Sequence, residues 1–364
     1  MAKKKLNAKS LLKRGRGKKK SRRFKTSDLL STGSTLLNLQ CSDNPFGAYY
    51  KGGYFNFVGD SDSGKTIFAM SALAEASISP NFEDYQLIFD NAEGGALMDL
   101  ESFFGRSLAN RVSEPPRGIS SSVEEFYYNL DDLYESETPF IYILDSMDVL
   151  EAEQEMEKFR KQKKASTEGR EIAGSFGVAK AKLNSQGLRR ARSLLQKTGS
   201  ILIIISQTRD KISPMSFETK TRAGGHALKF YARLEIWSKF KGEITKTYRG
   251  KKRQIGIISS LKVKKNHITG KKGTIDVPIF HSFGIDDVGS CVDYLIDEKH
   301  WSKSGQKVSA KDFDFSGTRE SLISYIQDND LEDELRKLVG NVWTDISEAC
   351  KVKRKNRYTG EDND

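Results

Sequence analysis

The sequence predicts an α/β fold in which a mostly parallel β-sheet is covered by helices on both faces. Buried strands are indicated by four short apolar runs, at 55–58, 85–90, 140–146 and 200–206. Apolar residues at helical spacing occur between these runs, for example at 122–137 and 178–197. This alternation is typical of parallel sheets, which collect their ligands at the carboxyl ends of the strands.

A basic tail precedes the predicted core. The chain has 60 Lys and Arg residues against 49 acidic ones, a net charge of +11, and 13 of these cations lie in residues 1–27, which contain no acid. The remaining 47 basic and 49 acidic residues leave the body nearly neutral. We expect residues 1–28 to be disordered and to bind nucleic acid through its phosphates, without reading sequence. A solubilising arm and a targeting segment are the alternatives.

Cysteine content and hydropathy exclude several classes of protein. Cys41, Cys291 and Cys350 are far apart and odd in number, which argues for a reducing compartment and against a disulfide or zinc framework. No apolar run approaches 18 residues, and the N-terminus lacks the apolar core of a signal peptide. We therefore expect a cytoplasmic protein without a membrane partner.

The stretch GDSDSGKT has the Gly-x4-Gly-Lys-Thr spacing of a phosphate-binding loop and follows the first apolar run. Its glycines let backbone N–H groups turn toward phosphates, and a helix that begins here directs its positive dipole end at the same anion. Lys65 would add a charge near the β- and γ-phosphates, and the Thr66 hydroxyl suits Mg²⁺. The predicted nucleotide loop consists of Gly59, Asp60, Ser61, Asp62, Ser63, Gly64, Lys65 and Thr66.

Polar residues follow the other apolar runs, where a parallel sheet would bring them to one edge. Asp145 closes its run with a carboxylate suited to hold Mg²⁺ directly or through water. Glu93 lies in a glycine-flanked loop, where a carboxylate can orient and deprotonate the water that attacks a γ-phosphate; a charge at a helix N-terminus is the alternative. Gln207 can sense the γ-phosphate through its amide, or act as a cap.

The long polar segment after Gln207 is a candidate nucleic-acid site. It places cations beside apolar side chains, a composition typical of single-strand binding, although a solvated surface loop is an alternative. The candidate residues are Arg209, Lys211, Met215, Phe217, Lys220, Arg222, Gly224 and Gly225.

Composition also predicts how the chain is divided. We expect a nucleotide-binding core over 29–274, which includes a highly charged segment at 151–171. A small α/β lobe is expected over 275–346, and a charged tail over 347–364. The acidic end of that tail, EDND, could modulate access of DNA by competing with phosphates.

Several stretches together resemble the RecA recombinase family. In chain order they are LLSTGSTLLNL for its first core segment, GDSDSGKT for its phosphate loop, DNAEGGAL for its catalytic-glutamate loop and YILDSMDVL for its second nucleotide motif. The start and exit of its second DNA-binding loop are matched by IIISQTR and ETKTRAGGHALKFYARLEIW. With LKVKKNHI and FGIDDVGSCVDYLIDEKHW, the similarity covers roughly residues 29–340.

The resemblance implies a RecA-like phosphate-loop ATPase core and an ATP-driven, Mg²⁺-dependent filament on single-stranded DNA that pairs it with double-stranded DNA and exchanges strands. It implies that Glu93 is the general base, that Lys65 holds phosphate and that Thr66 and Asp145 hold Mg²⁺. Gln207 would couple ATP to the DNA loop at 209–225. Single-strand-binding and mediator proteins are further expected partners.

The resemblance also implies DNA and subunit contacts outside the nucleotide site. The stretch STEGREIAGSFG (166–177), with Arg170, takes the place of the first DNA-binding loop. ATP lies between subunits in this family, and the positions that reach it from the neighbour correspond to Phe230, Lys265 and His267.

Three features depart from the family pattern. His267 replaces a lysine, the segment 151–171 is longer and more charged, and the basic tail replaces the helix and strand that dock onto the next subunit. The oligomer is therefore expected to be a filament or a ring. These departures are typical of a bacteriophage relative that acts in an infected bacterial cytoplasm.

Two other functions fit parts of the same sequence. One is a RecA-fold motor, such as a ring helicase or a recombination mediator, which hydrolyses ATP without pairing homologous DNA; the motif GGHALKFY argues against it. The other is a DNA-binding or annealing protein that uses ATP only as a conformational switch, against which Glu93 argues.

Overall fold

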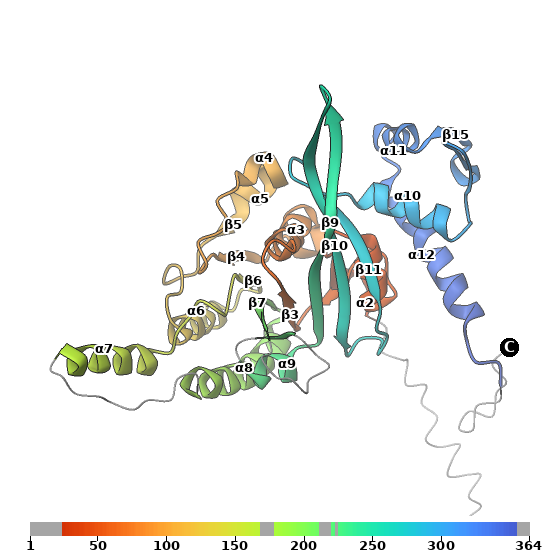
Figure 1. Cartoon of the computed structure of the whole chain (residues 1–364). Coiled ribbons are helices and arrows are strands. Elements are labelled where there is room, and N and C mark those ends of the chain that lie inside the picture. Colours follow the sequence, from red (N-terminus) through yellow and green to blue (C-terminus); the bar gives the residue numbers. More distant parts are fainter. Residues whose placement is uncertain (1–23, 168–177, 211–219, 223–224, 355–364) are drawn as a thin grey trace, which may run out of the picture.

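A computed structural model describes residues 24–167, 178–210, 220–222 and 225–354, and within them one sheet of ten strands lies at the centre (Figure 1). Its parallel part runs, in spatial order, β9 (Leu234–Tyr248), β3 (Tyr54–Gly59), β7 (Ile201–Asp210), β6 (Phe140–Leu144), β4 (Gln86–Asp90) and β5 (Val112–Ser113). Antiparallel strands extend it beyond β9, namely β10 (Lys251–Asn266), β11 (Thr274–Phe280) and β12 (Gly284–Ile285). The prediction of a mostly parallel sheet is confirmed.

Helices cover both faces of this sheet, as the sequence predicts. Successive side chains of a strand point to opposite faces, so Ile203 of β7 packs on the side of α3 (Lys65–Ile78), and Ile204 packs on the side of α6 (Val123–Glu135) and α8 (Val178–Thr198). Burial on both faces explains why residues 201–205 of β7 are all apolar and do not alternate with polar residues. Two separate apolar cores result, one on each face.

Shorter helices surround the sheet, and one helix projects away from it. The shorter ones are α2 (Thr35–Ser42), α4 (Leu100–Phe104), α5 (Arg106–Arg111) and α9 (His226–Tyr231). The charged segment predicted at 151–171 contains α7 (Glu153–Thr167), which extends away from the sheet in Figure 1. None of the helices in the described ranges is long and apolar enough to cross a membrane.

A small α/β lobe follows the sheet. It combines a three-stranded antiparallel sheet with three helices around a separate apolar core: β13 (Ser302–Ser304), β14 (Lys307–Ala310), β15 (Phe315–Thr318), α10 (Asp287–Asp297), α11 (Arg319–Asp328) and α12 (Glu332–Ala349). The boundary between core and lobe that the sequence predicts, at residue 275, falls inside β11, which pairs with β10 in the large sheet. Backbone pairing of β11 with β10, the strand directly before it, and of β12 with β11 therefore assigns 274–285 to the large sheet.

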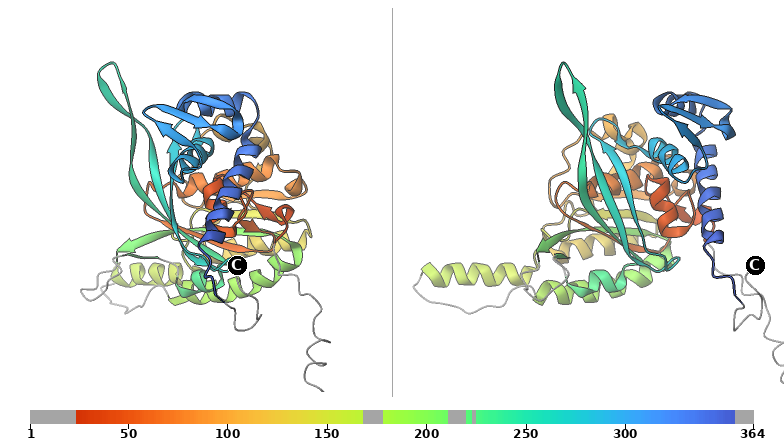
Figure 2. Two further views of the ribbon diagram at one scale, coloured as in Figure 1. Left: turned by 90° about the vertical axis from the view of Figure 1, so that its right-hand side faces the viewer. Right: turned by 45° about the vertical axis from the view of Figure 1, so that its right-hand side comes forward.

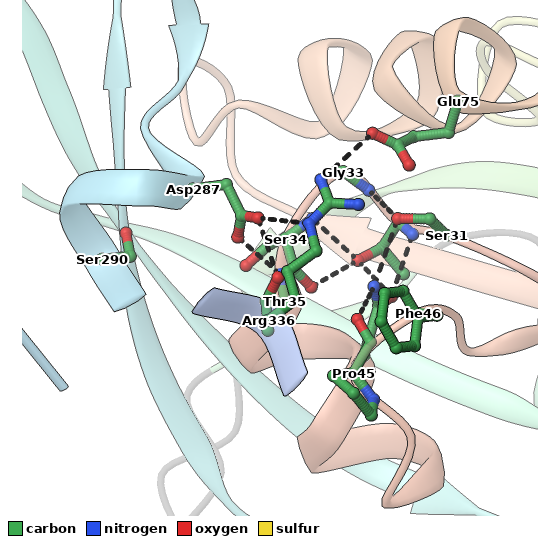
Figure 3. A network of polar contacts seen from close by, with 12 residues as sticks. Ser31, Gly33, Ser34, Thr35, Pro45, Phe46, Glu75, Asp287, Ser290 and Arg336 are labelled. Carbon is green, nitrogen blue, oxygen red and sulfur yellow. Dashed lines mark hydrogen bonds and ion pairs between the residues drawn. The ribbon is translucent and has the colours of Figure 1, made fainter. Parts of the chain in front are cut away.

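A half-buried ionic cluster joins the lobe to the core (Figure 3). Asp287, at the start of α10, accepts hydrogen bonds from the Thr35 backbone N–H at 2.6 Å and the Thr35 hydroxyl at 2.8 Å. Arg336 of α12 lies between two carboxylates, with Nε 3.3 Å from Asp287 and Nη2 3.8 Å from Glu75 of α3. The lobe is thus connected by charge to the helix that begins at the predicted phosphate loop.

Candidate nucleotide and DNA site

The predicted phosphate loop connects β3 to α3, as a strand–loop–helix unit requires. Gly64 has φ 84°, a left-handed conformation that favours glycine, and a Cβ there would lie 2.5 Å from Ile279 Cδ1. A Cβ on Gly59 would lie 2.1 Å from Ser238 Oγ. Both glycines are therefore required by close packing against β9 and β11, and α3 begins at Lys65 with its N-terminal N–H groups at the loop.

Lys65 is folded back into this loop. Its Nζ donates a hydrogen bond to the Asp60 carbonyl oxygen at 2.5 Å, and the side chain is buried. Burial lowers the pKa of Lys65, while the carboxylates of Asp145, Glu93 and Asp60 oppose this shift. The Lys65 ammonium thus bonds a carbonyl oxygen of its own loop, and it is placed to exchange this oxygen for those of a phosphate.

Thr66 and Asp145 meet although 79 positions separate them in sequence. The Thr66 hydroxyl donates to Asp145 Oδ2 at 2.6 Å, because β6 and β3 end at the same edge of the sheet. Burial raises the pKa of Asp145, Glu93 adds to this, and Thr66 and Lys65 oppose it. Hydroxyl and carboxylate oxygens are donors that Mg²⁺ accepts, so this pair fits a magnesium ion, although no cluster of three or more His, Cys, Asp or Glu suited to a metal occurs among the described residues.

Glu93 and Gln207 are in direct contact. Gln207 Nε2 donates to Glu93 Oε1 at 2.8 Å, and the Glu93 backbone N–H donates to the Asp145 carbonyl oxygen at 2.8 Å. The Gln207 backbone N–H donates to Asp148 Oδ2 at 2.6 Å, so both ends of the pair are held by the loop after β6. Sequence reasoning placed the two residues at one edge but did not predict that they touch.

A cavity of about 510 Å³ beside the phosphate loop was not predicted. It begins at Gly64 and Ile67 and is mostly apolar, since its other walls include Met98, Phe103, Phe240, Ile257, Ile279 and Phe280. These residues come from five segments that only the tertiary structure brings together, so no local pattern could have indicated the cavity.

The ends of the predicted DNA loop are anchored to each other. Arg209 lies in β7, and Lys220 and Arg222 lie in β8 (Lys220–Arg222), which pairs antiparallel with β7. Gly225 then precedes α9 with φ 82°. The other candidates, Arg170, Lys211, Met215, Phe217 and Gly224, lie outside the described residues.

The candidates for subunit contacts lie at the opposite edge of the sheet from the phosphate loop. Lys265 Nζ donates to the carbonyl oxygens of Lys229 and Phe230 at 2.6 and 2.8 Å, and the Phe230 side chain is 71% exposed. Lys265 pairs with Glu235, which lies opposite Asn56 near the start of β3, whereas the loop follows the end of that strand. Burial lowers the pKa of His267, and the charges of Lys265 and Arg233 add to the effect.

Comparison with known proteins gives one consistent result. A family profile described as the RecA N-terminal domain matches residues 2–286. Similar curated proteins include the Protein RecA of Trichodesmium erythraeum, 28% identical over 331 residues, which cover 89% of this chain and 82% of the relative. The Protein RecA of Rickettsia bellii is 28% identical, with 85% and 83% covered, and that of Bacteroides thetaiotaomicron is 28% identical, with 86% and 87% covered.

Proposed function

The chain belongs to the RecA family, and from this we propose that it is a DNA-dependent ATPase that binds single-stranded DNA and catalyses homologous pairing and strand exchange. The observation that carries the proposal is the hydrogen bond between Gln207 and Glu93, because it links the candidate hydrolytic carboxylate to the strand that leads into the DNA loop.

ATP would bind at the carboxyl edge of the sheet. Its phosphates would lie against the N–H groups of residues 60–66 and the Lys65 ammonium, at the N-terminus of α3. Thr66 and Asp145 would hold Mg²⁺, which neutralises charge on the phosphates. The adenine ring would occupy the apolar cavity next to Gly64, since flat aromatic rings are buried by such surfaces.

Glu93 would accept a proton from the water that attacks the γ-phosphate. Its side chain is exposed at the sheet edge, within reach of such a water, and its backbone is fixed by the hydrogen bond to Asp145. Gln207 donates to the same carboxylate, so a change in the γ-phosphate would move the end of β7 and the β7–β8 pair. The state of the γ-phosphate would in this way be coupled to the DNA loop through Glu93 and Gln207.

Assembly would complete the nucleotide site. Lys265 and Phe230 lie too far along the sheet to reach the phosphate loop of their own chain, so a contact with ATP would be made with the nucleotide of a second copy. We include a homo-oligomeric filament or ring in the proposal on this ground. The depressed pKa of His267 would leave that position uncharged at neutral pH, unlike a lysine.

The test is ATP hydrolysis measured with and without single-stranded DNA, with Lys65→Ala as the blank. We expect strong stimulation by DNA in the unchanged protein. We expect Gln207→Ala to retain basal hydrolysis but to lose most of the stimulation, because the contact between Glu93 and β7 is removed. Hydrolysis that is indifferent to DNA in the unchanged protein would refute the proposal.

A RecA-fold motor remains the second candidate, and strand exchange distinguishes it from the first. Transfer of a strand from a matched duplex to a single strand, without unwinding of unmatched duplex, would support the recombinase. Unwinding of unmatched duplex without transfer would support the motor.

A further inference from the structure

The outer end of β7 is bonded to the phosphate loop as well as to Glu93. Thr208 directly follows Gln207, and its hydroxyl donates a hydrogen bond to Asp60 Oδ1 in the loop. Both Thr208 and Asp60 are half-buried. The phosphate loop is therefore in direct contact with the strand that leads into the proposed DNA loop, and this contact does not involve Glu93.

Asp60 is held at two points. Its carbonyl oxygen accepts hydrogen bonds from Lys65 Nζ at 2.5 Å and from the Ser63 hydroxyl at 2.7 Å. Its carboxylate accepts the bond from Thr208. Through its main chain, Asp60 thus contacts the cation that is expected to hold phosphate, and through its side chain it contacts the end of β7.

A bound nucleotide would disturb both of these points. Phosphate oxygens would replace the Asp60 carbonyl oxygen as the partner of Lys65, because a hydrogen bond between two ions is stronger than one to a neutral oxygen. The Asp60 carboxylate has the same sign of charge as the phosphates, which would repel it. ADP is sufficient for both effects, since the lysine of such a loop reaches the β-phosphate as well as the γ-phosphate.

Thr208 lies where β7 leaves the large sheet. The pairing of β7 with β3 ends at Gln207, and Thr208 begins the pairing with β8, opposite Arg222. Residues 202–204 of β7 are instead paired on both sides, with β3 and with β6. A movement of Asp60 would therefore be passed to β8 and to the ends of the DNA loop, while the middle of β7 stays fixed in the sheet.

We propose that Asp60 and Thr208 form a second link between nucleotide and DNA, in which Thr208 is a positioning residue that responds to occupancy of the phosphate loop by any nucleotide. The bond between Gln207 and Glu93 responds instead to the γ-phosphate, beside which Glu93 would act. The inference rests on the proposed function, which supplies ATP and DNA as the ligands of the two sites. It adds a response to ADP, which the contact of Gln207 with Glu93 does not provide.

The two links predict different responses to ADP and to ATP. If a nucleotide changes the affinity for DNA by some factor, DNA changes the affinity for that nucleotide by the same factor. The ratio of ADP affinities with and without single-stranded DNA, the ADP ratio, therefore reports the Asp60–Thr208 link. The same ratio for a non-hydrolysable ATP analogue reports both links, and its excess over the ADP ratio reports the contact of Gln207 with Glu93.

The experiment removes the Thr208 hydroxyl from the full-length chain and keeps the branched shape of the side chain. Thr208→Val is compared with Thr208→Ser, which keeps the hydroxyl, and binding of labelled nucleotides is followed by fluorescence anisotropy. Thr247→Val is the matched control. Thr247 is exposed and pairs with Lys252 near the tip of the β9–β10 hairpin, which stands clear of the rest of the molecule (Figures 1 and 2).

We expect an ADP ratio of about tenfold in the unchanged protein, within the usual range of coupling between two sites. In Thr208→Val the ADP ratio should fall to about one, because the two sites no longer share the bond, while the excess for the ATP analogue stays. Thr208→Ser and Thr247→Val should keep both. Gln207→Ala should show the opposite pattern, with the ADP ratio kept and the excess lost.

Three results would overturn the inference. They are an unchanged ADP ratio in Thr208→Val, which would make the bond a purely structural one; loss of the ADP ratio in Thr208→Ser as well, which would assign the effect to packing; and no effect of DNA on ADP affinity in the unchanged protein. The last result leaves the proposed function standing when DNA still stimulates hydrolysis. Absence of that stimulation would instead refute the proposed function, and the ADP ratios would still show whether the two sites are coupled.

Discussion

At the scale of single residues, Glu93 connects the proposed nucleotide edge of the sheet to β7, the strand that leads into the proposed DNA loop. Its backbone donates to the Asp145 carbonyl oxygen and its carboxylate accepts from Gln207. The position of Glu93 in a glycine-flanked loop after a strand was visible in the sequence. Its contact with Gln207, 114 positions away, depends on strands β4 and β7 ending at one edge.

Replacing Glu93 by Gln should reduce ATP hydrolysis about 100- to 10,000-fold, the usual contribution of a general base. ATP binding should persist, because Lys65 and the loop N–H groups are unchanged. The measurement is steady-state hydrolysis beside nucleotide binding by fluorescence. Glu101→Gln, which removes an exposed carboxylate paired with Arg106, is the matched control and should retain full activity. Unchanged turnover in Glu93→Gln would favour a conformational switch over an enzyme.

At the scale of elements, the apolar periodicity located α6 and α8 closely, since both helices bury one face against the sheet. The same periodicity could not explain Gly187, which weakens a helix by its own propensity. In the structure, a Cβ at Gly187 would lie 2.2 Å from the ring of Tyr127 on α6. Close approach of the two helices therefore explains the glycine.

We expect Gly187→Ala to destabilise the protein, because Tyr127 is also held by a hydrogen bond to Asn184 at 3.0 Å and cannot move freely. Overpacking typically costs about 1–3 kcal/mol, which exceeds the gain of about 1 kcal/mol in helix propensity. Urea unfolding measures the difference. Gly242→Ala, where no atom lies within 4 Å of the added Cβ, should be neutral; a stabilised Gly187→Ala would contradict the packing argument.

At the scale of the whole molecule, Arg336 connects the small lobe to the core by pairing with Glu75 of α3, while its other partner, Asp287, belongs to the lobe and bonds Thr35 of the core (Figure 3). Burial raises the pKa of Glu75, and Arg336 is the first of the groups that oppose this rise. Removal of the guanidinium would leave two half-buried carboxylates without their cation, which costs more than removing the whole cluster.

Arg336→Ala should lower the free energy of unfolding by about 1–3 kcal/mol at neutral pH, between the values typical of exposed and of fully buried ion pairs. The folded-state pKa of Glu75 would then rise further above its unfolded value, so stability would be lost as pH rises through the interval between the two. The deficit should therefore shrink as pH falls toward the ordinary glutamate range. Unfolding by urea at several pH values tests this, with the exposed neighbour Lys337→Ala as control. A deficit independent of pH would show that Glu75 is not the affected group.

The basic tail gives a second prediction at this scale. Deletion of residues 1–27 removes 13 cations, and each phosphate contact contributes about 0.9 to the slope of log affinity against log salt. We expect the slope for DNA binding to become shallower while the order of affinity among DNA sequences stays the same. An unchanged slope would assign the tail to solubility or targeting.

The sequence by itself determined the class of fold, the phosphate loop and the polar residues at the strand ends. These features depend on local chemistry, namely glycines that permit a turn, periodic apolar residues, and a carboxylate or amide placed directly after a buried strand. It also predicted the small lobe, but not that β11 belongs to the large sheet.

Only the tertiary structure decided which of these residues are in contact and where a cavity forms beside them. The contact of Gln207 with Glu93, the cavity beside Gly64 and the pairing of Arg336 with Glu75 all join distant positions through packing. Such relations depend on the whole chain, because distant segments meet only where the sheet and its covering helices bring them together.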